Sequence, residues 1–109
     1  MKEIGTFEQW LEIKVNEPQL VLFVKTENCS VCEGLYPQVD ALRSDYTIPF
    51  FKVNIAKVPE MAGQLSLFTA PVVLLFHEGR EMSRFARFVQ MEELKYRLDE
   101  LMERREGHE

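Results

Sequence analysis

The sequence predicts a single α/β domain in which helices cover both faces of a mixed β-sheet, a three-layer α/β/α sandwich. Continuous apolar runs, typical of strands buried on both faces, alternate along the chain with segments of helical periodicity. Helices between such strands favour parallel pairing, and a hairpin signal near the end adds an antiparallel strand. A chain of 109 residues forms one domain and leaves no room for a second.

The first half of the chain supplies a short strand, two helices and two inner strands. Thr6 is a candidate N-cap for a helix whose apolar residues recur at helical spacing. Residues 20–24, Leu-Val-Leu-Phe-Val, predict a central strand buried on both faces. We expect the second helix from Cys32 to about Ser44 and the second inner strand over Pro49–Ile55.

The second half supplies a helix, a hairpin and a final helix. These elements are expected over residues 59–67, 71–76 and 82–88 and from Met91 to Leu101. The pair Glu78-Gly79 is the turn signal between the two strands. Residues 1–103 therefore form the domain, and residues 104–109 are expected to be a frayed polar tail.

Charge and hydropathy exclude several classes of function. The formal charge is −5, and acidic residues are interleaved with the basic ones, which disfavours nucleic-acid binding. No apolar run approaches the ~18 residues that a membrane span needs. The first residues lack the apolar core of a secretory signal, so we expect a cytoplasmic protein that is not bound to a membrane. We also expect the protein to be a monomer. In that compartment a close cysteine pair is more often redox-active or metal-binding than structural.

The two cysteines, Cys29 and Cys32, lie between the central strand and the following helix. This is the carboxyl end of a strand, where sites of α/β proteins usually lie. Their spacing brings both sulfurs to one side of the first helical turn. The positive helix N-terminus would stabilise a thiolate at Cys29 and lower its pKa. Cys29 is then the attacking thiol, and Cys32, one turn deeper, the resolving thiol.

Two alternatives to redox chemistry remain open for this pair. Zinc needs about four ligands, and the chain offers only Cys29, Cys32, His77 and His108, so a site would have to be shared between two copies. The cysteines could also simply pack in the core. His77 itself, at the end of its strand, is expected to be a surface histidine.

The chain resembles the thioredoxin family over nearly its whole length. The resemblance is carried by the Cys29-x-x-Cys32 pair after a buried strand, by Pro37 five residues later, and by Thr69-Ala70-Pro71 before the next apolar strand. Lys52 also stands where thioredoxins carry a lysine on the adjacent strand. Pro37 lies in the interior of its helix and should kink that helix. We expect no catalytic role for it.

The resemblance implies a substrate groove beside the cysteines. Pro71 would be cis and would face the pair, turning the backbone at Thr69 and Ala70 toward an extended substrate that pairs as an added strand. Arg87 stands near the position of a glycine that lines the family's groove. A long cation there would narrow the groove or select acidic partners. Asn28 replaces the tryptophan that usually precedes the first cysteine.

Other departures concern proton transfer. Phe23 stands where thioredoxins carry a buried aspartate that helps to move the proton of the second cysteine, so slower resolution at Cys32 is expected. Lys52 loses its usual partner and either reaches solvent or favours the thiolates. Glu27 and Glu33 flank the pair, as solvated loop charges or as substitute proton carriers.

The predicted function is therefore thiol–disulfide exchange. A disulfide-containing substrate would be reduced through a Cys29/Cys32 cycle, and a reductase or a low-molecular-weight thiol would restore the dithiol. No organic cofactor and no metal is implied, because the electrons reside on the two sulfurs. The alternatives are a catalytically weak interaction module of the same fold and a redox sensor that peroxide oxidises.

Overall fold

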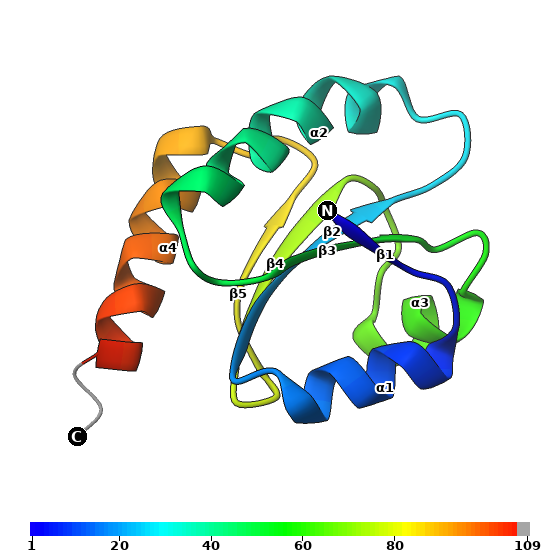
Figure 1. Cartoon of the computed structure of the whole chain (residues 1–109). Coiled ribbons are helices and arrows are strands. Elements are labelled where there is room, and N and C mark those ends of the chain that lie inside the picture. The colour runs from blue at the N-terminus through cyan, green and yellow to red at the C-terminus, as the bar shows by residue number, and fades with distance from the viewer. Residues whose placement is uncertain (107–109) are drawn as a thin grey trace.

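A computed structural model describes residues 1–106 and shows a five-stranded sheet between two layers of helices (Figure 1). In chain order the elements are β1 (Lys2–Ile4), α1 (Phe7–Asn16), β2 (Gln19–Lys25), α2 (Ser30–Ala41), the 3₁₀ helix η1 (Leu42–Asp45), β3 (Phe50–Asn54), α3 (Pro59–Leu65), β4 (Val72–His77), β5 (Arg80–Ala86) and α4 (Met91–Glu106). The three-layer sandwich predicted from the sequence is confirmed. Within the described part of the chain, none of the helices combines the length and the apolar character that a membrane-spanning helix needs.

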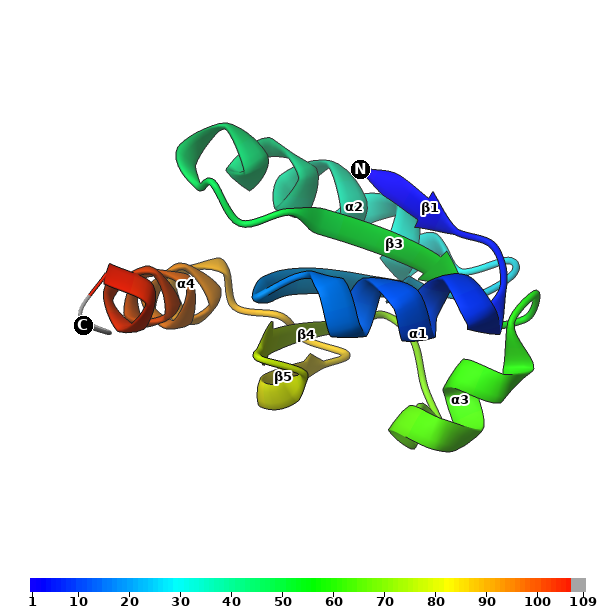
Figure 2. The same ribbon diagram turned by 60° about the horizontal axis from the view of Figure 1, so that its bottom comes forward.

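The sheet is mixed, with strand order β1-β3-β2-β4-β5. β2 pairs parallel with β3 on one side and antiparallel with β4 on the other, so β2 is the central strand, as its apolar run predicts. Figure 2 shows β1 beside β3 at one edge and β5 beside β4 at the other. The β4–β5 turn at Glu78 and Gly79 has positive φ at both residues, the conformation of a tight hairpin turn.

The central strand divides its side chains between two cores. Leu20, Leu22 and Val24 point to the side covered by α1 and α3, whereas Val21 and Phe23 point to the side covered by α2 and α4. All five are at most 1% exposed. Successive residues of a strand face opposite sides, so a strand with helices on both sides must be apolar at every position. This requirement explains why the run lacks alternation.

Helix ends follow local capping rules, with some shifts from the expected bounds. Thr6 caps α1 as predicted, because its Oγ1 accepts a hydrogen bond of 3.1 Å from the N–H of Gln9. α2 begins at Ser30, two residues earlier than expected, since Cys29 occupies the N-cap position. Its expected last turn is the separate 3₁₀ helix η1.

The C-terminal elements end at other residues than expected. β5 ends at Ala86 because Arg87, with φ +67°, leaves the extended conformation. α4 continues to Glu106, three residues into the segment expected to be a polar tail. Ion pairs one turn apart, such as those of Arg97 with Glu93 and Glu100, favour the helix on its exposed face. Residues 107–109 lie outside the described part of the chain.

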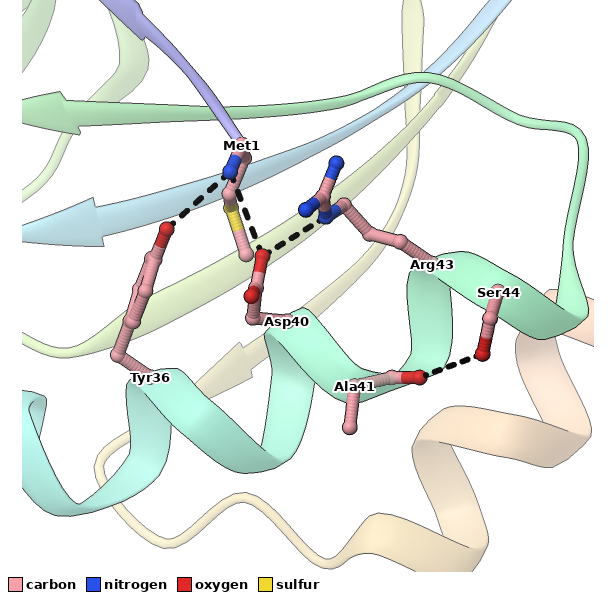
Figure 3. Close-up of polar contacts among 6 residues, drawn as sticks. All are labelled: Met1, Tyr36, Asp40, Ala41, Arg43 and Ser44. Atoms are coloured by element: carbon pink, nitrogen blue, oxygen red, sulfur yellow. Dashed lines mark hydrogen bonds and ion pairs between the residues drawn. The ribbon is translucent and has the colours of Figure 1, made fainter.

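The edge strand β1 is tied to α2 by polar contacts (Figure 3). The amino group of Met1 lies 3.2 Å from the Tyr36 hydroxyl and 3.3 Å from Asp40 Oδ1, which also accepts a hydrogen bond of 2.7 Å from Arg43. Partial burial acts to raise the pKa of Asp40, but the two cationic donors outweigh it, and the pKa lies below its ordinary value. These contacts hold Tyr36 over the sheet, where it borders the site.

Candidate active site

The two cysteines lie where β2 ends and α2 begins, as the sequence predicts. Cys29 is the N-cap of α2, and Cys32 is in the first turn of this helix. Before them, Asn28 has φ +50°, a left-handed conformation that asparagine tolerates better than most residues. This turn redirects the chain from the sheet into the helix. It leaves Cys29 at the carboxyl end of the central strand.

The cysteines form a disulfide, and their environments differ. Their Cα atoms are 5.2 Å apart. Cys29 is partly exposed, whereas Cys32 is 1% exposed. The N–H of Cys32 donates a hydrogen bond of 3.2 Å to Cys29 Sγ. A sulfur that accepts from the first turn of a helix gains the stabilisation that a thiolate there would need. An incoming thiol or disulfide would therefore meet Cys29 first.

The loop before β4 forms the opposite wall of the site. Cys29 Sγ lies 4.0 Å from the carbonyl oxygen of Ala70. The Ala70–Pro71 peptide bond is cis, as the resemblance implies. On the far side of Pro71, its carbonyl oxygen accepts a hydrogen bond of 3.0 Å from the N–H of Arg87. Ala70 thus contacts the disulfide, and a main-chain hydrogen bond joins the next residue, Pro71, to Arg87.

A cavity of about 210 Å³ lies behind the disulfide. Its lining residues are Phe23, Lys25, Cys32, Glu33, Tyr36 and Lys52. Phe23 and Lys52 are register partners on β2 and β3, so the lysine is adjacent to the phenylalanine that replaces an acid. Lys52 Nζ lies 5.1 Å from the centre of the Tyr36 ring, which also packs edge-on against Phe23. This arrangement places a cation in the same cavity as the buried sulfur.

The Cys29–Cys32 pair after a buried strand and the Thr69-Ala70-Pro71 loop are among the features by which the sequence resembles one family, and a direct comparison agrees. The thioredoxin family profile matches residues 3–100. The chain belongs to the thioredoxin family. Membership of this family and the Cys29–Cys32 disulfide support thiol–disulfide exchange as the general chemistry of the protein.

Comparisons with individual proteins agree with this assignment. The chain is 36% identical over 87 residues to the thioredoxin-like protein YdfQ of Bacillus subtilis (strain 168), covering 79% of this chain and 78% of that protein. The thioredoxin of Plasmodium falciparum superposes with a TM-score of 0.84 at 17% identity, covering 92% of this chain and 98% of that one. The thioredoxin of Fasciola hepatica gives 0.82 at 22% identity over the same shares. At such identities the two structures establish the fold.

Some residues singled out in the sequence lie away from the disulfide or have other partners. His77 pairs with Gln19 at the start of β2, about 20 Å along the strand from its other end at Lys25. Its Nδ1 lies 3.0 Å from Gln19 Nε2. Glu27 accepts a hydrogen bond of 2.6 Å from the buried Asn54, so its carboxylate stabilises a loop. Pro37 is an exposed residue inside α2, and its kink stays a prediction.

The zinc alternative has no support in the described residues. Between residues 1 and 104, no group of three or more His, Cys, Asp or Glu side chains lies close enough to hold a metal ion. His77 is at the opposite end of the sheet from the cysteines. His108 lies outside the described residues.

Three side chains of the site region were missed in the sequence. Tyr36 stands four residues after Cys32, a spacing that places both on one face of a helix and could have been noticed. Phe68 and Phe88 precede and follow the strands of the hairpin and are 86% and 88% exposed. Aromatic residues are expected in the core by default, and no local pattern signals that these two are exposed.

Proposed function

We propose that this protein reduces disulfides through a dithiol–disulfide cycle of Cys29 and Cys32. The observation that supports it best is the asymmetry of the pair. Cys29 is partly exposed at a helix N-terminus beside the cis-proline loop, and Cys32 is buried one turn behind it. A nucleophile must meet its substrate, whereas a resolving thiol needs only to reach the nucleophile.

The cycle begins with the reduced form. The Cys29 thiolate attacks one sulfur of the substrate disulfide, the substrate S–S bond breaks, and the leaving thiolate takes a proton from water. A mixed disulfide then joins Cys29 to the substrate. Cys32 loses its proton and attacks the Cys29 sulfur, which releases the second substrate thiolate. Two electrons have passed to the substrate, and the protein holds the Cys29–Cys32 disulfide seen in the structure.

The cis-proline loop would bind the substrate chain. Ala70 precedes β4 and lies outside the paired ladder of the sheet, so its main-chain groups are available to an extended segment. Asn28 and Thr69 would border this segment. A recycling reductant, either a disulfide reductase or a low-molecular-weight thiol, completes the cycle. The setting we propose is the cytoplasm, where such reductants keep thiols reduced, with the protein acting as a monomer.

Cys32 would be deprotonated without the buried acid that thioredoxins use. Phe23 contributes no proton acceptor, and Lys52 in the same cavity stabilises the thiolate by its charge. Glu33 also lines this cavity and would relay the proton to water. Resolution is then slower than with a dedicated base, and the mixed disulfide lasts longer.

Two cysteine variants test this function. Cys29→Ser should abolish reduction of a model protein disulfide, whereas Cys32→Ser should accumulate a covalent adduct with the substrate, seen by mass spectrometry and released by dithiothreitol. Turnover that persists without Cys29 would overturn the proposal. If the unaltered protein shows no turnover, an interaction module is favoured instead. If peroxide oxidises the pair but no exchange with protein disulfides occurs, a redox sensor is favoured.

The reduction potential of the pair defines the direction of the reaction. It is measured by equilibrating the protein in graded glutathione buffers. A potential near the ~−270 mV of thioredoxin supports a reductant, and a potential above about −200 mV supports an oxidant or isomerase.

A further inference from the structure

The cavity behind the disulfide is lined by two lysines whose charges no carboxylate neutralises. Lys25 and Lys52 both border it. Lys52 is the register partner of Phe23, and Lys25 follows Phe23 by two residues, so both lysines lie on the face of the sheet that α2 covers. Within residues 1–104, no carboxylate lies within ion-pair distance of either ammonium group. The cavity therefore holds two unneutralised cations.

The other walls of this cavity are aromatic, and one side of it meets solvent. The rings of Phe23 and Tyr36 pack edge-on with their centres 5.3 Å apart, and both line the cavity. Glu33 is the acidic residue of the lining and is exposed, so the cavity opens to solvent beside it. Two lysines and one glutamate leave the lining with one excess positive charge. Aromatic walls and a net positive charge together suit an anion that carries an apolar group.

The sequence also explains why a negative charge is missing here. Phe23 stands where thioredoxins carry a buried aspartate, so Lys52 lacks the carboxylate that is its usual partner. Two like charges on one face repel each other, and the effect is stronger beside apolar walls than in water. A cleft lined by one sign of charge raises the local concentration of ions of the opposite sign. An anion from solution can therefore supply the charge that position 23 does not.

We propose that this cavity binds a small aromatic monocarboxylate, of which benzoate is the simplest member. Its carboxylate would lie between Lys25 and Lys52 and accept charge-assisted hydrogen bonds from both. Its ring would pack against Phe23 and Tyr36. An apolar cavity of about 150 Å³ holds benzene. The volume of about 210 Å³ therefore has room for one such ring with its carboxylate.

The bound acid would regulate the resolving cysteine, an effect that rests on the proposed function and adds no chemical step to it. Cys32 lines the same cavity. The carboxylate would neutralise Lys52, whose charge stabilises the Cys32 thiolate. The ring would displace the water through which Glu33 passes on the proton. Both effects slow the attack by Cys32, so the mixed disulfide at Cys29 would last longer while the acid is bound.

Three probes with the same ring and different charge test the binding site. Oxidised protein labelled with nitrogen-15 is titrated with benzoate, benzamide and benzylamine, and the backbone amide signals are followed by NMR. Benzoate should give saturable shifts at Cys32, Tyr36 and Lys52. Its Kd should be about tenfold lower than that of benzamide, because a charged group gains more from each hydrogen bond than a neutral one. Benzylamine, a cation, should not bind.

Lysine variants separate the cavity from surface charge in general. Lys25→Met and Lys52→Met keep the apolar stem and remove the charge, so each should weaken benzoate binding and change benzamide binding little. Lys57 is exposed and does not line the cavity, and Lys57→Met should bind benzoate as the unaltered protein does. Circular dichroism and the thermal midpoint verify that each variant is folded. Equal affinities for benzoate and benzamide, or full benzoate affinity in both cavity variants, would overturn the site.

A kinetic measurement tests the regulation. The rate at which Cys32 resolves the mixed disulfide is followed by stopped flow with and without saturating benzoate. Benzoate should slow the unaltered protein several-fold and leave Lys52→Met unchanged. An unchanged rate in the unaltered protein overturns the regulation and leaves the binding site in place. The titration needs no turnover, so a protein that binds benzoate but reduces no disulfide refutes the proposed function and its regulation, not the site. A protein that reduces disulfides but binds no benzoate refutes the site alone.

Discussion

A phenylalanine in place of a buried acid changes what the neighbouring lysine can do. Phe23 is fully buried, and its register partner Lys52 has its ammonium group over the ring of Tyr36. Such a cation–π contact is worth about 0.5–2 kcal/mol, depending on desolvation. It holds Lys52 at the cavity that Cys32 also lines. With no carboxylate at position 23 to neutralise it, the charge of Lys52 would stabilise a Cys32 thiolate in the reduced form, as the proposed function requires.

Replacing Lys52 should therefore affect resolution more than stability. Lys52→Met keeps an unbranched apolar stem and removes the charge. We expect the free energy of unfolding to fall by about 1 kcal/mol or less, because the side chain is partly exposed. Attack by Cys32 on the mixed disulfide should slow several-fold at neutral pH, and its pH profile should move to higher pH. Stopped-flow single-turnover measurements across pH give the rate of attack by Cys32 and its pH profile.

Lys57 provides the matched control. It is an exposed lysine on the loop after β3 and does not line the cavity. Lys57→Met should leave the pH profile in place. If the Lys52 and Lys57 variants show the same profile, Lys52 has only a structural part in the site.

Between elements, one tyrosine joins the loop before β3 to α4. The Tyr46 hydroxyl donates a hydrogen bond of 2.8 Å to Asp99 Oδ1. Burial, this hydrogen bond and the nearby negative charges of Asp99 and Asp45 raise the pKa of Tyr46 from 10.0 to about 12. The contact therefore stabilises the folded state as long as the hydroxyl keeps its proton.

The raised pKa sets the pH range in which this contribution is lost. Below pH 10 both folded and unfolded chains keep the Tyr46 proton, so the contribution is fully present. Between pH 10 and about 12 the unfolded chain releases the proton first, and the free energy of unfolding falls. Tyr46→Phe should cost about 1 kcal/mol at pH 8, and the difference from the unaltered protein should vanish toward pH 12. Urea unfolding across this range measures it.

A second tyrosine serves as the reference for this effect. Tyr96 on α4 is 57% exposed, and Tyr96→Phe should change the stability little, with no trend over the same pH range. A constant difference between Tyr46→Phe and the unaltered protein from pH 8 to 12 would contradict the role of the Asp99 hydrogen bond.

For the whole molecule, the sequence predicts those features, such as the positions of strands and of the site, that depend on local patterns of residues. The apolar runs at residues 20–24 and 71–76 locate the two inner antiparallel partners β2 and β4, and the spacing of Cys29 and Cys32 locates the site. Exposure and strain depend on contacts between distant segments, which no local pattern reports. Nothing around Phe68 or Phe88 in the sequence separates them from core residues. The end of β5, expected at residue 88 and found at Ala86, was wrong for the same reason. Arg87 leaves the strand where its N–H donates a hydrogen bond to the Pro71 carbonyl oxygen.

The oxidation state of the Cys29–Cys32 pair affects the whole molecule, because it changes the stability of the folded protein. The Cys29–Cys32 bond closes a loop with a sequence separation of only 3. In the chain-entropy model such a small loop stabilises the folded protein by about 2 kcal/mol through the unfolded state. The N-terminus of α2 opposes this by stabilising the Cys29 thiolate of the reduced form, by about 0.3–1 kcal/mol.

The oxidised protein should therefore be more stable than the reduced protein by about 1–2 kcal/mol. By the thermodynamic cycle, the same difference lowers the potential of the folded pair by about 20–40 mV relative to the unfolded chain. Urea unfolding with and without dithiothreitol measures it, and a Cys29→Ser/Cys32→Ser double variant should not respond to the reductant. If the reduced form is instead the more stable, the fold favours the dithiol. The potential of the folded pair then lies above that of the unfolded chain, and the predicted order of stabilities is wrong.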